Sequence, residues 1–163
     1  VIKKWVINKK ARELGATKIA TGHNLDDEAQ TVFLNMLKGN PELGVGFGPK
    51  VGVISDRKFV QRIKPLFFCS EKETRKFAEG MKFNIQYERC PFHVEGYRKD
   101  IRVILNNLEK QMPGTKLNIV NNFMELLPKL KRKYHTGKKL GYCSVCGEPS
   151  KQDVCKLCLL MNV

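Results

Sequence analysis

Four cysteines close to the end of the sequence form two CxxC pairs, Cys143 with Cys146 and Cys155 with Cys158, separated by eight residues. Each CxxC turn presents two thiolates to one side, and two such turns can surround a Zn²⁺ ion tetrahedrally. This stretch is too short to bury enough apolar surface to fold alone, whereas a structural zinc supplies on the order of 10–16 kcal/mol of apparent folding free energy. We expect an intracellular chain, in which disulfides are rare, and paired CxxC turns suit a structural metal better than redox exchange. The spacing therefore predicts one zinc ion bound by these four cysteines.

A second candidate site is the segment TGHNLDD, residues 21–27. It lies between a short apolar run and an amphipathic run, where backbone N–H groups converge and can hold a phosphate or an adenine edge. The adjacent Asp26 and Asp27 could hold Mg²⁺ beside a nucleotide or orient a nucleophile. They could equally complement the positive end of a helix dipole, with His23 an ordinary turn residue. Spacing alone leaves both interpretations open.

The elements around this segment alternate between helical and strand patterns. A strand, which we expect to be buried, is predicted over 17–22, and Ser70 with Glu73 forms a capping box that opens a later helix. The other expected elements are helices over 1–15 and from 26 to the Gly39-Asn40-Pro41 stop, a glycine-rich loop over 42–50, a hairpin or two edge strands over 51–54 and 59–63, and helices over 70–81, 95–111 and 117–127. The last helix could continue past Pro128 into the basic run. This order predicts an α/β fold, part of a doubly wound, Rossmann-like domain over 1–136 with C-terminal helices, followed by a small zinc ribbon over 137–163.

Composition and charge limit the possible partners. The 163 residues are 42% hydrophobic, which is ordinary for a globular domain with a small appendage, and we find no apolar run long enough to span a membrane. Lys and Arg number 30 against 16 acids, so the net charge of +14 favours a polyanion. The residues 128–139 concentrate cations around Tyr134 and His135, which can stack on bases. These predicted RNA-binding cations are Lys129, Lys131, Arg132, Lys133, Lys138 and Lys139. RNA is favoured over a solvated face, while a membrane surface or an acidic protein stays open.

Three motifs taken together resemble one family. They are TGHNLDDEAQT at 21–31, ERCPFH at 88–93 and CSVCGEPSKQDVCKLC at 143–158. In this order they are similar to the PP-loop ATP pyrophosphatases that introduce sulfur into tRNA, most closely the branch that makes 2-thiouridine from T-loop ribothymidine or the wobble uridine. The resemblance implies that ATP, with Mg²⁺, adenylates the uracil 2-oxygen, and that sulfur from a ubiquitin-like carrier or another donor displaces AMP. It also implies that 1–136 is the C-terminal part of a PP-loop domain with a helical extension.

The resemblance further implies roles for individual residues. Asp27 is expected to be the catalytic aspartate, with Asp26 as its catalytic neighbour. The residues expected to contact ATP are Lys3, Gly22 and His23. Cys90 is expected to be a ligand of a [4Fe–4S] cluster, whose two further cysteines are absent from this chain.

The chain lacks the nucleotide loop Ser-Gly-Gly-x-Asp-Ser of that family and its N-terminal zinc finger, both of which precede the position of Val1 in the family. We therefore expect the C-terminal half of a cytoplasmic tRNA 2-sulfurtransferase, inactive by itself, that forms a homodimer, binds tRNA and has no contact with membranes. The rival hypothesis is a non-catalytic RNA-binding module built from the basic helix and the zinc ribbon.

Overall fold

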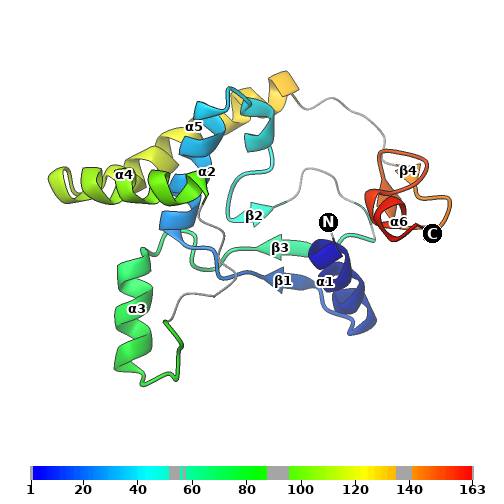
Figure 1. Ribbon diagram of the computed structural model, residues 1–163, viewed down its shortest axis with the longest axis horizontal. Helices are drawn as coiled ribbons and strands as arrows, with labels where there is room; N and C mark the ends of the chain where they lie inside the picture. The colour runs from blue at the N-terminus through cyan, green and yellow to red at the C-terminus, as the bar shows by residue number, and fades with distance from the viewer. Residues whose placement is uncertain (1, 52–55, 57, 88–95, 135–140, 163) are drawn as a thin grey trace.

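A computed structural model describes residues 2–51, 56, 58–87, 96–134 and 141–162. The chain has a mixed α/β fold with a small three-stranded sheet, a group of helices on one side of it, and a second small sheet near the C-terminus (Figure 1). Among the described helices, none combines the length and the apolar character needed to cross a bilayer.

The three-stranded sheet has the strand order β1-β3-β2. Its strands are β1 (Lys18–Ala20), β2 (Lys50–Val51) and β3 (Gln61–Ile63). β1 runs parallel to β3, while β2 pairs antiparallel with β3 and places Lys50 opposite Ile63. A strand lies within 17–22 as predicted, and β2 and β3 pair antiparallel as in the predicted hairpin. The alternative of two edge strands is wrong for β3, which lies between β1 and β2. The expected burial of β1 is wrong, because Lys18 and Ala20 are exposed on a strand that pairs on one side only among the described residues.

The predicted helices are confirmed, four of them with small shifts of their ends, while the last one extends seven residues beyond 127, to Tyr134. They are α1 (Ile2–Glu13), α2 (Leu25–Leu37), α3 (Glu71–Gly80), α4 (Tyr97–Gln111) and α5 (Thr115–Tyr134). The predicted capping box at Ser70 is present, and its hydroxyl accepts the Glu73 N–H. Pro128 lacks a backbone N–H donor, but it does not end α5. The neighbouring Leu127 is buried in the core and holds the helix in place there.

The apolar core lies where α2, α4 and α5 pack against one another. Its buried members are Leu25, Ala29, Val32, Phe47, Phe67, Ile101, Leu105, Val120, Phe123 and Leu127. The stretch predicted as a glycine-rich loop contributes the 3₁₀ helix η1 (Pro41–Gly44) and the buried Phe47. The Phe47 ring stacks edge-on against Phe123, with centroids 5.0 Å apart. Gly44 is needed for this approach, because a Cβ at that position would lie 2.5 Å from Cζ of Phe123.

Candidate functional site

The cysteine unit, residues 141–162, is organised by its four cysteines. Its elements are the antiparallel strands β4 (Gly141–Tyr142) and β5 (Pro149–Ser150) and the helix α6 (Lys156–Met161). One ligand atom from each of Cys143, Cys146, Cys155 and Cys158 lies within 4.8 Å of all the others. Three of these cysteines are buried and Cys146 is half-buried. The structure therefore brings together all four predicted metal ligands.

The distances between these sulfurs fit a single metal ion. The Sγ atoms of Cys143 and Cys158 are 3.9 Å apart, and those of Cys146 and Cys155 are 3.6 Å apart. A tetrahedral zinc with Zn–S bonds of about 2.3 Å places its sulfurs about 3.8 Å from one another. A disulfide has a bond of about 2.05 Å, and a [4Fe–4S] cluster binds each cysteine to a different iron, so its sulfurs lie farther apart. The geometry thus matches one tetrahedral ion.

The surroundings of Cys143, Cys146 and Cys158 shift the pKa values of their thiols in different directions. Backbone N–H groups of Cys146 and Cys155 hydrogen-bond to the sulfur of Cys143 and lower its pKa to about 6. Burial raises the pKa of Cys158 to about 12 and also raises the pKa of Cys146 above its ordinary value. Cys158 is therefore a neutral thiol at neutral pH without a cation, and a bound divalent ion would stabilise its thiolate form.

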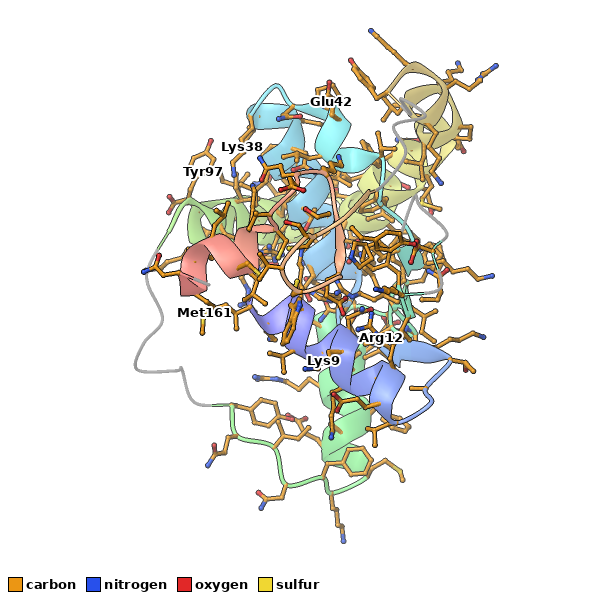
Figure 2. The ribbon with its side chains drawn as sticks, turned by 90° about the vertical axis from the view of Figure 1, so that its right-hand side faces the viewer. Lys9, Arg12, Lys38, Glu42, Tyr97 and Met161 are labelled. Atoms are coloured by element: carbon orange, nitrogen blue, oxygen red, sulfur yellow. The ribbon has the colours of Figure 1, made fainter. Side chains whose placement is uncertain are left out.

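Polar contacts dock the cysteine unit onto α1 and the loop before β3. The Arg12 guanidinium donates two hydrogen bonds to the Glu148 carboxylate, one of them 2.9 Å long, and a third to the Lys58 carbonyl oxygen at 2.8 Å. Nζ of Lys58 donates to the Gly147 carbonyl oxygen and lies over the Tyr142 ring. The hydrogen bond to Glu148 raises the pKa of Arg12. Figure 2 looks onto this side of the molecule, with α6 and α1 in the foreground and Arg12 labelled on α1.

The segment 21–27 lies at the carboxyl ends of the two parallel strands. The Thr21 N–H donates to the Ile63 carbonyl oxygen at 3.0 Å, which extends the β1–β3 ladder by one bond. The Leu25 N–H then donates to the Cys69 carbonyl oxygen at 2.9 Å, so the start of α2 lies against the chain that follows β3. In open α/β sheets, this edge is where ligands bind.

Gly22 and His23 are both exposed at this edge. A Cβ at Gly22 would meet no atom within 4 Å, so packing within this chain does not require a glycine there. The His23 ring places Nδ1 3.0 Å from Oγ1 of Thr21. The surface above the loop is therefore open to a ligand.

Asp27 lies in the first turn of α2 with its side chain partly exposed. Asn24 and Asp27 form a capping box, in which each backbone N–H donates to the other side chain at 3.0 and 3.3 Å. From α4, Nη2 of Arg98 lies 3.5 Å from the second carboxylate oxygen of Asp27, while its Nε donates to Gln30 at 3.1 Å. Asp27 therefore offers an anionic group at the strand edge, next to a cation.

Asp26 points the other way, into the protein. Its residue is 6% exposed, and its carboxylate is bound by the Lys116 ammonium from α5 and by the Glu71 N–H from α3, the latter at 2.7 Å. The two neighbouring aspartates thus have different environments, although they are equivalent in the sequence pattern.

The other predicted site residues are more dispersed. Lys3 is exposed on α1, which Figure 1 shows beside the start of β1, whereas segment 21–27 follows the end of that strand. Lys129, Lys131, Arg132 and Lys133 are all exposed on the last turns of α5. Cys90, Lys138 and Lys139 lie outside the described residues.

Sequence reasoning missed the cations that contact Asp26 and Asp27. Arg98 and Lys116 lie 71 and 90 positions away from the aspartates that they contact, and neither belongs to a motif. A lone cation near the start of a predicted helix gives no spacing signal, so only the packing of α4 and α5 on α2 reveals them.

Comparisons with known proteins give consistent matches. The chain is 35% identical over 160 residues to a tRNA-5-methyluridine(54) 2-sulfurtransferase of Pyrococcus horikoshii, covering 96% of this chain and 49% of that protein. It is 35% identical to cytoplasmic tRNA 2-thiolation protein 1 of Aspergillus niger, covering 99% of this chain and 46% of that protein. No family model matches the chain.

A solved structure is also similar. The U34-tRNA thiolase NcsA from Methanococcus maripaludis, determined with its [4Fe-4S] cluster, superposes with a TM-score of 0.76 at 32% identity, covering 99% of this chain and 50% of that one. The chain thus spans about half the length of the curated relatives that it matches. The resemblance inferred from the motifs is confirmed: nearly the whole of this chain is similar to about half of proteins named for tRNA 2-thiolation.

Proposed function

We propose that this chain forms the C-terminal half of an ATP-dependent tRNA uridine 2-sulfurtransferase with a PP-loop domain. The observation that carries the proposal is the partly exposed Asp27 carboxylate beside Arg98 at the carboxyl edge of the parallel strands. Ligands of open α/β sheets bind at this edge, and the matched relatives bear tRNA thiolation names. The other half of the active site would come from the part of the relatives that this chain does not match.

The reaction that we propose has two steps at one uracil. The 2-oxygen attacks the α-phosphorus of ATP and pyrophosphate leaves, which converts a poor leaving oxygen into a good one. A sulfur nucleophile then attacks C2, the C–O bond breaks, and AMP leaves with the oxygen. Cations near the α-phosphate, Mg²⁺ included, stabilise the negative charge that develops there.

The exposed groups of the loop have distinct roles in this proposal. Asp27 is the catalytic carboxylate, and the contact with Arg98 directs it towards the strand edge. Gly22 leaves room for ATP to approach the backbone, and His23 contacts the nucleotide. Lys3 is proposed as a further contact to ATP.

For the cysteine unit we propose one zinc ion held by Cys143, Cys146, Cys155 and Cys158. The sulfur separations of 3.6 and 3.9 Å support this assignment. Zinc would supply folding free energy and no redox chemistry, and the Arg12–Glu148 contact would fix the unit against α1. The unit is then a structural zinc ribbon.

A [4Fe–4S] cluster is proposed with Cys90 as one ligand, for the incoming sulfur. The solved NcsA contains such a cluster. Cys90 lies outside the described residues, and the four described cysteines that come together have the spacing of a single ion. The cluster would therefore require cysteines from outside this chain, and iron analysis of Cys90→Ala in the complete protein would test the ligand.

The proposed partners follow from charge and from the relatives. The tRNA backbone would contact the exposed cations at the end of α5, together with Lys138 and Lys139. A ubiquitin-like carrier or another donor would bring the sulfur, the enzyme would be a homodimer, and it would act in the cytoplasm, as the name of the Aspergillus niger relative states for that protein.

The test is a thiolation assay on the complete protein with ATP, Mg²⁺, tRNA and a sulfide source. Asp27→Asn should lower the rate by on the order of 10²-fold or more with only a small loss of thermal stability, because asparagine keeps an oxygen for the Asn24 N–H and the ion pair that it loses is partly exposed. Lys129→Gln on α5 is the matched control and should weaken tRNA binding while kcat persists. If the complete protein binds tRNA but forms no 2-thiouridine, the alternative RNA-binding module, which the exposed basic end of α5 favours, replaces the enzyme.

A further inference from the structure

The two adjacent aspartates of the loop differ sharply in exposure. The Asp27 side chain is 36% exposed, whereas that of Asp26 is 8% exposed. A carboxylate that binds substrate or Mg²⁺ must present at least one oxygen to the ligand. The neighbours of Asp26 therefore decide whether it can do so.

Groups from two other helices already occupy the Asp26 carboxylate. Oδ2 accepts the backbone N–H of Glu71, the first residue of α3, at 2.7 Å. Oδ1 is bound by Nζ of Lys116, which is itself 2.6 Å from Oδ1 of Asn106 on α4. This buried network joins the first turn of α2 to α3, α4 and α5.

Lys116 is in turn held in place by its own helix end. The Glu109 carboxylate accepts the Lys116 N–H at 2.8 Å and the Gly114 N–H at 2.7 Å, and so caps the start of α5 from α4. With a side chain only 11% exposed, Lys116 has little freedom to leave Asp26. A ligand could reach Asp26 only by displacing a buried ammonium group, which would then lack its counter-charge.

We propose that Asp26 is a positioning residue that, with Lys116 and Asn106, fixes the first turn of α2 and so directs Asp27, and that Asp26 itself contacts neither substrate nor Mg²⁺. The effect of Asp26 on catalysis rests on the proposed function of Asp27, whereas the role of the network in fixing the helix turn does not. Asp26 and Asp27 share one helical turn, so anchoring the first fixes the backbone of the second. A displacement of about 1 Å at a reacting group can cost on the order of 10²-fold in rate.

A charge-balanced pair of variants tests this assignment in the complete protein. Asp26→Asn keeps an oxygen for the Glu71 N–H but leaves the Lys116 ammonium without an anion. The double variant Asp26→Asn with Lys116→Met removes both charges, and replacing both partners of a buried ion pair by neutral groups is far less damaging than removing one. Asp27→Asn is the matched control at the neighbouring position.

Three quantities are measured. Tm comes from thermal unfolding, and kcat with KM for ATP and the amide exchange rate of Asp27 are measured at a temperature where every variant is folded. For Asp26→Asn we expect Tm to fall by about 10 °C, kcat to fall about tenfold with KM changed less than twofold, and Asp27 exchange to rise about tenfold. In the double variant, Tm should return to within a few degrees of wild type, and kcat and the Asp27 exchange rate to within about threefold. Asp27→Asn should lose kcat with a much smaller fall in Tm than Asp26→Asn, because its ion pair with Arg98 is partly exposed.

The outcomes separate the hypotheses. A double variant that regains Tm but stays as inactive as Asp27→Asn would show that the Asp26 carboxylate acts on substrate, which overturns the proposal. An unchanged kcat in Asp26→Asn would make the network merely structural, which also overturns it. If wild type forms no 2-thiouridine, the proposed function fails, and exchange of the Asp27 amide still decides whether Asp26 positions it: an unchanged exchange rate in Asp26→Asn refutes the network role.

Discussion

The helical body and the cysteine unit are stabilised by different interactions. The helical body, made of α2, α4 and α5, buries a contiguous cluster of ten apolar residues and a network of ion pairs beside it. The buried cluster of the cysteine unit consists of Cys143, Cys155 and Cys158, with Val154 and Leu157 packed against it. The body can therefore fold by burying apolar surface, whereas we expect the unit to depend on a metal ion bound by its sulfurs.

This difference explains how the two regions are joined. Their described contacts are polar, through Arg12, Glu148 and Lys58, and the apolar cores stay separate. Polar docking fixes orientation without merging two folding units. Each region should thus respond separately to perturbation.

The largest expected effect is that of removing the metal. Chelation should unfold the cysteine unit, because a structural zinc contributes on the order of 10–16 kcal/mol of apparent folding free energy, while the helical body stays folded. Amide NMR signals of 141–162 should collapse and those of α2 and α5 persist. Cys69→Ser, outside the unit, is the control and should leave the metal content at one ion. Well-dispersed signals of the unit in metal-free protein would contradict this dependence.

The next largest effect is expected in the body. Phe123→Ala should cost about 3–5 kcal/mol in unfolding free energy, because it removes a buried ring that packs on Phe47 and leaves a cavity. The loss of unfolding free energy is measured by denaturant titration with circular dichroism as the readout. Leu126→Ala, half-exposed on the same helix, should change stability by less than about 0.5 kcal/mol. A loss of bound metal in Phe123→Ala would refute the independence of the two regions.

A smaller effect is expected at the contact between the regions. Glu148→Gln should cost about 1 kcal/mol, because its carboxylate receives two hydrogen bonds from Arg12 at a partly buried site. A double-mutant cycle with Arg12→Met isolates the coupling. The exposed pair of Lys10 and Glu13 is the control and should give a coupling close to zero. Equal coupling in both pairs would mean that the docking contact is no more than a surface ion pair.

The smallest effect concerns α3, whose one buried residue, Ala78, lies outside the ten-residue apolar cluster. The hydroxyl and the backbone N–H of Ser70 lower the pKa of Glu73 from its ordinary value of 4.5. Because the folded pKa is the lower one, this contribution to helix stability is present above pH 4.5 and is lost as the pH falls through the folded value. An NMR titration of Glu73 should show the lowered pKa, and Ser70→Ala should move it back up. No upward movement would assign the shift to other groups.

Local patterns predicted much of this molecule. The helix ends at Ser70 and Gly39, the CxxC spacing and the strand before Gly22 all depend on neighbouring residues, so the sequence was sufficient to find them. The burial of β1 was predicted wrongly, because exposure depends on which elements lie beside a strand. The packing of Phe47 was missed for the same reason, since glycines around it indicated only a loop.

The sequence by itself determined the ligand set of the cysteine unit and the segment that ends the first strand. Both are short-range patterns in which residue type and spacing set the chemistry. Tertiary structure alone decided which of Asp26 and Asp27 faces solvent, because Lys116, Glu71 and Arg98 reach them from distant positions in the chain. Two adjacent carboxylates are chemically alike until packing buries one of them and gives it a counter-charge.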